Sequence, residues 1–171
     1  MNKQRFLGFF LLIGAVPVLL ALLMLKTGWY HAGVNNKGVW YQQEIRLLPA
    51  ADKQQAHWRL VYLEPDNCDK HCQAVVNLMQ QIDQALGRKQ DQLDLVVLTG
   101  QPTVMARTDG HVLRLNSSFA GLPAGSLIVV EQQGLALLHY PLPATLTQLP
   151  LLGKDVMADL QKLMKFDRGP A

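Results

Sequence analysis

Residues 57–72, HWRLVYLEPDNCDKHC, contain the strand and helix start from which the fold is predicted. Its first seven residues are bulky and β-preferring, and they predict a buried strand. The next residues form a turn in which Asp66 or Asn67 can cap a helix. That helix is expected to run to about Leu86, where Gly87 provides a C-cap. Its apolar residues keep to one stripe at helical spacing, namely Cys72, Val75, Val76, Met79, Ile82 and Leu86.

The elements after this helix extend the pattern towards the C-terminus. Residues 93–98 predict a second buried strand, so strand, helix and strand form a βαβ unit with parallel strands. The segment 100–125 suggests only a short strand or helix near 111–115. A β-hairpin and a last helix are then expected over 127–131, 135–140 and 154–165. This order predicts an α/β fold of thioredoxin-like type, a central β-sheet with flanking helices.

The N-terminal block from Phe6 to Leu25 is apolar and carries no charge. At a rise of ~1.5 Å per residue it just covers a hydrocarbon core of ~30 Å. A cleaved signal peptide is the alternative, but the block is longer than a usual signal core and no small-x-small cleavage site follows. We therefore expect a cytoplasmic tail, a single transmembrane helix, a linker and one periplasmic domain, over residues 1–5, 6–25, 26–42 and 43–171.

Composition narrows the function classes. The chain has 171 residues, of which 17% are charged, and a net charge of +3 with scattered basic residues. No basic–aromatic motif is present, so nothing indicates nucleic-acid binding. The sequence also contains no Gly-rich phosphate loop, HExxH motif or nucleophile elbow. The two cysteines, close together in sequence, suit an oxidising compartment such as the periplasm.

The cysteines form the motif CDKHC at the junction between the first buried strand and the first helix of the domain. Two residues four apart on a helix share a face, so Cys68 and Cys72 can close a disulfide or hold a soft metal ion. A helix N-terminus also favours thiolate over thiol. A purely structural disulfide is the alternative, but so short a loop constrains the unfolded chain little. An inert pair stays open as well, because Cys72 belongs to the apolar stripe.

Residues 57–72 resemble the strand, turn and helix of the Sco/SenC proteins, copper and thiol-redox factors for cytochrome c oxidase assembly. The motif of that family is a CxxxC, usually followed by Pro. The likeness covers roughly residues 34–168 and is carried further by NNKGVW, LIVVEQQGLALLHYP and KDVMADLQKLMK, residues 35–40, 127–141 and 154–165. It is nearest to shortened Sco-like proteins. Gln73 replaces the usual Pro, and residues 124–126 lack the histidine that is the family's third copper ligand.

This resemblance implies a membrane-anchored assembly factor for a respiratory oxidase. It would act by thiol–disulfide exchange, with Cys68 as the attacking thiolate and Cys72 as its partner. A Cu(I) metallochaperone using the same cysteines and a scaffold without chemistry are the alternatives. The expected partners are the inner membrane and either an oxidase subunit or a copper-delivery protein.

If a third copper ligand is present, it comes from another histidine, although two thiolates alone can hold Cu(I). His139 is the main candidate, because a two-residue hairpin loop places it opposite Ser126 or Ile128, towards the position of the missing ligand. A three-residue loop would turn it to the other face. His71 and His111 are further candidates, although an ordinary polar role suits both.

Overall fold

The computed structural model describes residues 3–27, 36–51, 57–67, 70–100, 108–109, 112–116 and 122–166. Residues 1–35 and 36–171 form two separate compact units. The first unit contains one helix, α1 (Lys3–Lys26). The second contains β1 (Val39–Arg46), β2 (Trp58–Glu64), α2 (Lys70–Leu86), η1 (Gly87–Gln92), β3 (Leu93–Thr99), β4 (Thr108–Asp109), β5 (Val112–Asn116), β6 (Ser126–Glu131), β7 (Leu135–Pro141), η2 (Leu146–Gln148) and α3 (Leu149–Phe166).

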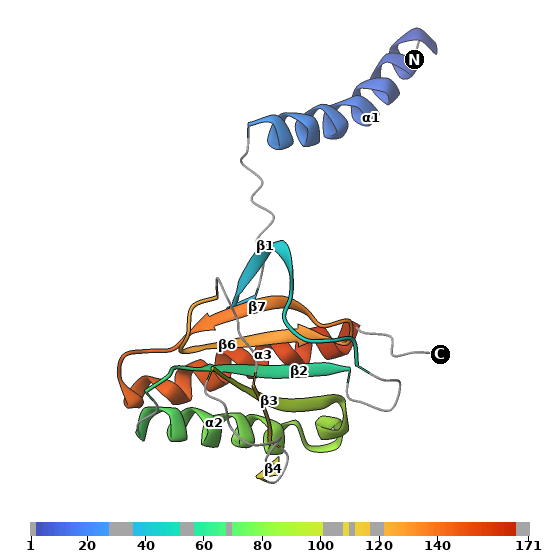
Figure 1. The fold of residues 1–171 in the computed structure, drawn as a ribbon. Coiled ribbons are helices and arrows are strands. Elements are labelled where there is room, and N and C mark those ends of the chain that lie inside the picture. The colour runs from blue at the N-terminus through green and yellow to red at the C-terminus, as the bar shows by residue number, and fades with distance from the viewer. Residues whose placement is uncertain are drawn as a thin grey trace. The chain divides into compact units, whose positions relative to one another are not determined.

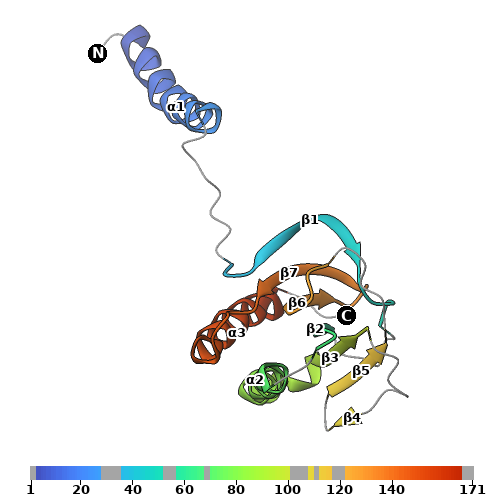
Figure 2. The ribbon, with the colours of Figure 1, turned by 60° about the vertical axis from the view of Figure 1, so that its left-hand side comes forward.

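One mixed sheet of seven strands organises the second unit, in the order β1-β7-β6-β2-β3-β5-β4. The central strand β2 runs parallel to β3 and antiparallel to β6. Helices α2 and α3 lie side by side on the same face of this sheet (Figures 1 and 2). The predicted βαβ unit, hairpin and last helix are all present, so the α/β architecture expected from the sequence is confirmed.

The sheet separates two apolar layers because successive side chains of each strand point to opposite faces. Leu60 and Tyr62 of β2 face the helices and join the layer that also contains Cys72 and Leu160. The second layer contains Val61 and no helical residue; its buried members are Leu48, Val61, Leu63, Val96, Leu98, Ile128, Val130 and Ala136. All seven residues of β2 are buried, as a strand with a packed layer on each face requires.

The two helices dock through a small residue. A Cβ on Gly153 of α3 would lie 2.7 Å from the Leu78 Cδ1 of α2, closer than carbon atoms pack. Helix α3 begins at Leu149, five residues before the predicted start, so this glycine is helical. Gly87 ends α2 with φ +57°, as the predicted C-cap requires.

The hairpin of β6 and β7 has a three-residue loop, Gln132–Gly134, and an irregular ladder. Gly134 has φ +87°, and a Cβ there would collide with the Leu48 carbonyl oxygen. A register shift between Val129 and Val130 follows. Because of this shift His139 pairs with Ile128, the pairing that a two-residue loop was expected to give. The length of the loop therefore does not by itself determine which residues of β6 and β7 are paired.

The second unit begins earlier than the predicted domain start at residue 43. Strand β1 starts at Val39, inside the stretch expected to be a linker over 26–42. The backbone N–H groups of Lys37 and Gly38 donate to Asp159 Oδ2 at 2.7 and 2.9 Å, which fixes the chain to α3. We call residues 36–46 the N-terminal strap. The sequence missed its start because the glycines and asparagines of this stretch suggested a loop.

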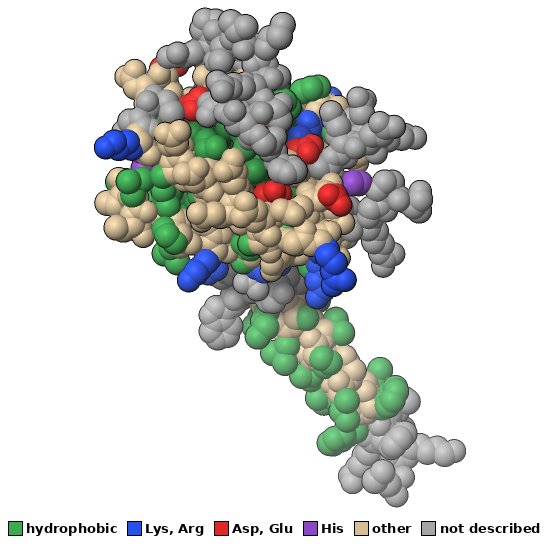
Figure 3. All heavy atoms as spheres, turned by 90° about the horizontal axis from the view of Figure 1, so that it is seen from below, with side chains coloured by type: hydrophobic (Ala, Val, Ile, Leu, Met, Phe, Trp, Pro, Cys, Tyr) green, Lys and Arg blue, Asp and Glu red, His purple; other side chains and the backbone are tan. Residues whose placement is uncertain are grey.

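Helix α1 is 24 residues long and contains Pro17. Its large apolar side chains are exposed along the described part (Figure 3), among them Phe9, Phe10, Leu11, Leu12, Ile13, Leu19 and Leu23. In the part of the chain that the structure describes, no helix reaches the combined length and hydropathy needed to cross a bilayer.

Candidate thiol site

The candidate site lies where β2 ends and α2 begins. Strand β2 delivers the chain to Glu64, a turn follows, and α2 starts at Lys70, so Cys72 falls in the first turn of the helix. Its side chain is only 2% exposed and packs in the layer between the sheet and the helices. This thiol is therefore shielded from solvent.

The neighbouring strand ends at the same edge of the sheet. Glu64 and Thr99 are register partners at the last positions of β2 and β3, and both are buried. Asp66 lies close to Gly100, the residue that follows β3, because a Cβ on Gly100 would be 3.2 Å from the Asp66 carboxylate. Polar groups thus gather at the carboxyl ends of two parallel strands, the usual position of a site in an open α/β sheet.

Cys68 lies outside the described residues, two positions before α2 begins. Among the described residues Cys72 carries a free thiol. A sulfur that is almost wholly buried cannot be reached by the disulfide of another protein, because the attacking and leaving sulfurs must approach in line. The burial of Cys72 therefore excludes it as the thiol that first attacks a partner in a thiol–disulfide exchange reaction.

His139 does not lie on the face that carries Cys72. It is half-buried on β7 opposite Ile128, which belongs to the layer without helices, whereas Cys72 belongs to the layer with them. Its ring contacts Tyr41 with a centroid distance of 5.1 Å, and its Nδ1 lies 3.3 Å from the Val39 carbonyl oxygen. The sheet thus separates this histidine from the thiol, and the structure does not bring the two together as a shared metal site.

The other histidines lie at different distances from the thiol site. His71 is half-buried on α2 beside Cys72, and His57 precedes β2 at the opposite end of that strand. His111, like Cys68, lies outside the described residues. Within the described part of the chain, no group of three or more His, Cys, Asp or Glu residues is arranged to hold a metal ion.

A buried carboxylate that the sequence analysis did not single out lies on α3. Asp159 is fully buried, and besides the two strap amides its Oδ2 accepts the Tyr140 hydroxyl at 2.9 Å. Burial, followed by the charge and hydrogen bond of Asp159, raises the pKa of Tyr140 well above its usual value. Gly38 packs on that ring, since a Cβ there would lie 2.5 Å from it. In the sequence, Asp159 could have been found as an acidic residue beside Leu160 on the apolar stripe of the last helix.

Arg59 of β2 is a second buried charged residue that the sequence analysis did not single out, and it is 7% exposed. Its guanidinium donates to the Pro49 carbonyl at 2.9 Å and to the Glu131 and Gln132 carbonyls at 3.1 and 2.8 Å. Burial lowers the pKa of Arg59, and Asp94 opposes that shift. This side chain joins Pro49, three residues after the N-terminal strap, to the β6–β7 turn.

The fold and site together define a thioredoxin-like α/β domain with a cysteine at the start of its first helix. Residues 58–167 match the family "Transmembrane-like, thioredoxin-like, C-terminal domain". The chain belongs to this family. The match begins at the first residue of β2, so the N-terminal strap and α1 lie outside it.

Sco/SenC proteins, which the sequence resembles, are among the solved structures that match. A SCO1/SenC family lipoprotein from Bacillus anthracis is 9% identical, with 72% of this chain and 98% of that chain covered and a TM-score of 0.48. Copper-bound ScoI from Bradyrhizobium japonicum is 13% identical, with 59% and 85% covered and a TM-score of 0.38. No curated protein matches the chain. At these low identities and TM-scores the matched structures carry no argument about the site.

Proposed function

We propose that this protein is a membrane-anchored thiol–disulfide exchange factor that serves the assembly of a respiratory cytochrome oxidase. The thioredoxin-like family supports the exchange chemistry. The choice of an oxidase as the target rests on the sequence resemblance of residues 57–72 to the Sco/SenC motif.

The observation that carries the proposal is the position of Cys72. It is 2% exposed in the first turn of α2, at the carboxyl end of the central strand. A buried thiol suits the resolving step, which takes place within one protein. The attack on a partner then falls to Cys68, four residues earlier in the chain.

The exchange proceeds in two balanced steps. The Cys68 thiolate attacks one sulfur of a partner disulfide, forms a mixed disulfide and releases the second partner sulfur as a thiolate. The Cys72 thiol then loses its proton and attacks the Cys68 sulfur, which releases the other partner thiolate. The partner gains two electrons, and the Cys68–Cys72 pair becomes a disulfide. A dithiol reductant on the same side of the membrane must return the pair to its reduced form.

The location is part of the same proposal. The uncharged stretch from Phe6 to Leu25 and the exposed apolar side chains of α1 support a single inner-membrane anchor. Lys3 and Arg5 precede the stretch and support an N-terminus in the cytoplasm, with the thioredoxin-like domain in the periplasm. An oxidising compartment also gives an exchange factor its substrates, since disulfides persist there.

Copper carriage is the second candidate function. Two thiolates suit Cu(I), which prefers soft ligands, and the resemblance to the Sco/SenC motif supports the same choice. The metal would be cargo held by Cys68 and Cys72. The position of His139 on the opposite face of the sheet does not favour it as a third ligand.

A trapping experiment tests the proposal. In cells that express the full chain, Cys72→Ser should accumulate a mixed disulfide between Cys68 and a partner, because the resolving thiol is missing. Cys68→Ser is the matched control and should accumulate none. Cys72→Ala repeats the trap in case a hydroxyl is poorly tolerated in the apolar layer.

Four results would overturn the proposal. Equal trapping by both cysteine variants would contradict the assigned order of attack. No trapping with either variant would contradict thiol–disulfide exchange altogether. Normal oxidase assembly with the Cys68→Ser/Cys72→Ser variant would leave only a scaffold role. Tight, cysteine-dependent binding of one Cu(I) per chain, without trapping, would favour copper carriage instead.

A further inference from the structure

A pocket lies at the end of the sheet opposite to the thiol site. It has a volume of about 400 Å³ and is lined by His57, Trp58, Glu131, Gln132, Gln133, Leu163 and Phe166. Trp58 begins β2, whereas Cys72 follows the end of that strand, so the length of β2 separates the two places. Pockets for small molecules have volumes of this order. Neither the family match nor the thiol chemistry gives this pocket a role.

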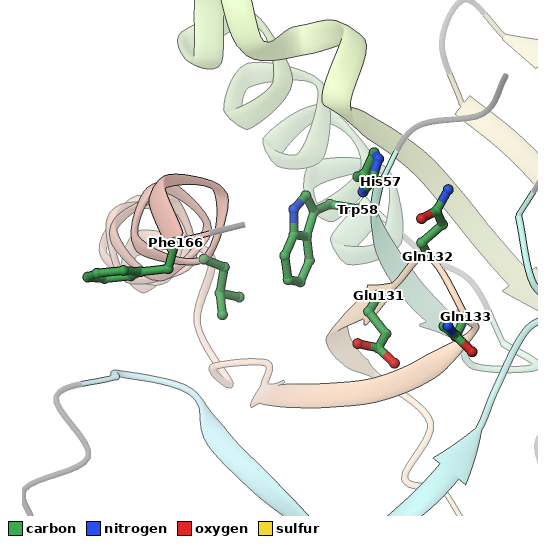
Figure 4. Close-up of a pocket in the computed structure, with 7 residues that line it drawn as sticks. His57, Trp58, Glu131, Gln132, Gln133 and Phe166 are labelled. Carbon is green, nitrogen blue, oxygen red and sulfur yellow. The ribbon is translucent and has the colours of Figure 1, made fainter. Parts of the chain in front are cut away.

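The floor and one wall of the pocket come from a cross-strand pair. Trp58 and Glu131 are register partners on β2 and β6, so both side chains project from the same face of the sheet. Leu163 and Phe166, in the last turns of α3, supply the opposite side. Figure 4 shows the Trp58 ring between the end of α3 and Glu131. Trp58 is 7% exposed and Phe166 is 80% exposed, so the pocket is apolar at depth and open at its rim.

The wall formed by the β6–β7 turn is fixed from behind. Arg59 donates hydrogen bonds to the Glu131 and Gln132 carbonyl oxygens from the other face of the sheet. The Ala51 N–H also donates to the Gln132 carbonyl oxygen at 2.8 Å. These bonds hold the backbone that carries three of the lining side chains. A pocket that is already formed loses little conformational entropy when a ligand enters it.

The charge of the lining selects the class of ligand. With histidines counted as neutral, Glu131 carries the only formal charge among the seven described residues that line the pocket. The pocket also lies at the C-terminal end of α3, where the helix dipole gives a partial negative charge; Lys165 of that last turn is not among the lining residues. An indole face next to a carboxylate is a favourable environment for an ammonium group. Anions find no cationic partner among these residues.

We propose that this pocket binds a small organic ammonium compound, with its apolar body on Trp58 and its positive charge at Glu131. The site is independent of the cysteine pair, and a ligand there leaves Cys68 and Cys72 free to react.

Three probes of one shape test the proposal: benzylammonium, benzyl alcohol and benzoate. The full chain with Trp29→Phe and Trp40→Phe leaves Trp58 as its single tryptophan, whose fluorescence reports occupancy of the pocket. Benzylammonium should change this fluorescence saturably and bind about tenfold more tightly than benzyl alcohol, while benzoate should bind most weakly. Glu131→Gln should reduce the preference for the cation to near unity. Glu44→Gln removes the same charge from an exposed position of β1 and should leave the preference unchanged.

Several results would overturn the assignment. Equal affinity for the three probes would show an unselective apolar cleft, and a preference for benzoate would reverse the charge argument. Absence of any saturable change with benzylammonium would remove the site. An unchanged preference in the Glu131→Gln variant would remove the carboxylate from recognition.

Discussion

Replacing Asp159 by Asn should release the N-terminal strap from the domain while the rest of the fold persists. The Oδ2 atom accepts three hydrogen bonds, from the Lys37 and Gly38 amides and from the Tyr140 hydroxyl. Hydrogen bonds to a charged acceptor exceed those to a neutral one by about 1 kcal/mol each, so neutralising the carboxylate should cost roughly 3 kcal/mol. The 3.7 Å ion pair with Lys162 adds little, because that lysine is 41% exposed.

Hydrogen exchange measures this effect where it occurs. A loss of roughly 3 kcal/mol speeds exchange of the strap amides by about a hundredfold, provided that they exchange by local opening. Asp155→Asn is the control, because it makes the same charge change one turn earlier at a half-buried position of α3. Exchange of the β2 and β3 amides should be accelerated by no more than this factor in Asp159→Asn and should stay unchanged in Asp155→Asn. Strap amides that exchange at the parent rate in Asp159→Asn would contradict the role of this carboxylate.

Two further predictions concern glycine geometry and alkaline pH. Gly134→Ala should lower the free energy of unfolding in urea by more than Gly87→Ala does: both have positive φ, but only a Cβ at 134 meets backbone, the Leu48 carbonyl. Gly87→Ala should cost about 1 kcal/mol, and an equal cost for the two would contradict the contact. Because its pKa is raised in the folded state, Tyr140 contributes stability that is present below pH ~10 and is lost above it. Urea unfolding of Tyr140→Phe should therefore show a flatter decline above pH ~10, and a decline parallel to that of the parent would contradict it.

Much of the fold follows from periodicity. The all-apolar run from Leu60 to Leu63 predicts a strand buried on both faces, and the stripe from Cys72 to Leu86 predicts a helix packed on it; both are present. The strap was missed because its fold depends on a distant partner. Its exposed side chains give little pattern, and the buried Asp159 that holds it lies more than one hundred residues away in the chain.

The candidate site could be predicted only in part. The motif places Cys72 at a helix start, and its burial follows from the apolar stripe. The face occupied by His139 did not follow from loop length, because a register shift inside β6 changes the pairing that the loop alone would set. The roles of Arg59 and Asp159 depend on contacts between segments, which no local pattern reports. Charged residues within apolar runs were the available signal for both.

Cys68 and Cys72 are proposed to form a reversible pair, and a redox titration of the purified full chain tests this. The protein is equilibrated with defined ratios of oxidised and reduced dithiothreitol. The free thiols are then alkylated, and the mass of the chain is measured by mass spectrometry. A reversible pair should give one two-electron transition from two alkylated cysteines to none, with the chain monomeric and the transition absent in Cys68→Ser. Two thiols that stay reduced throughout, or that oxidise only between chains, would contradict it.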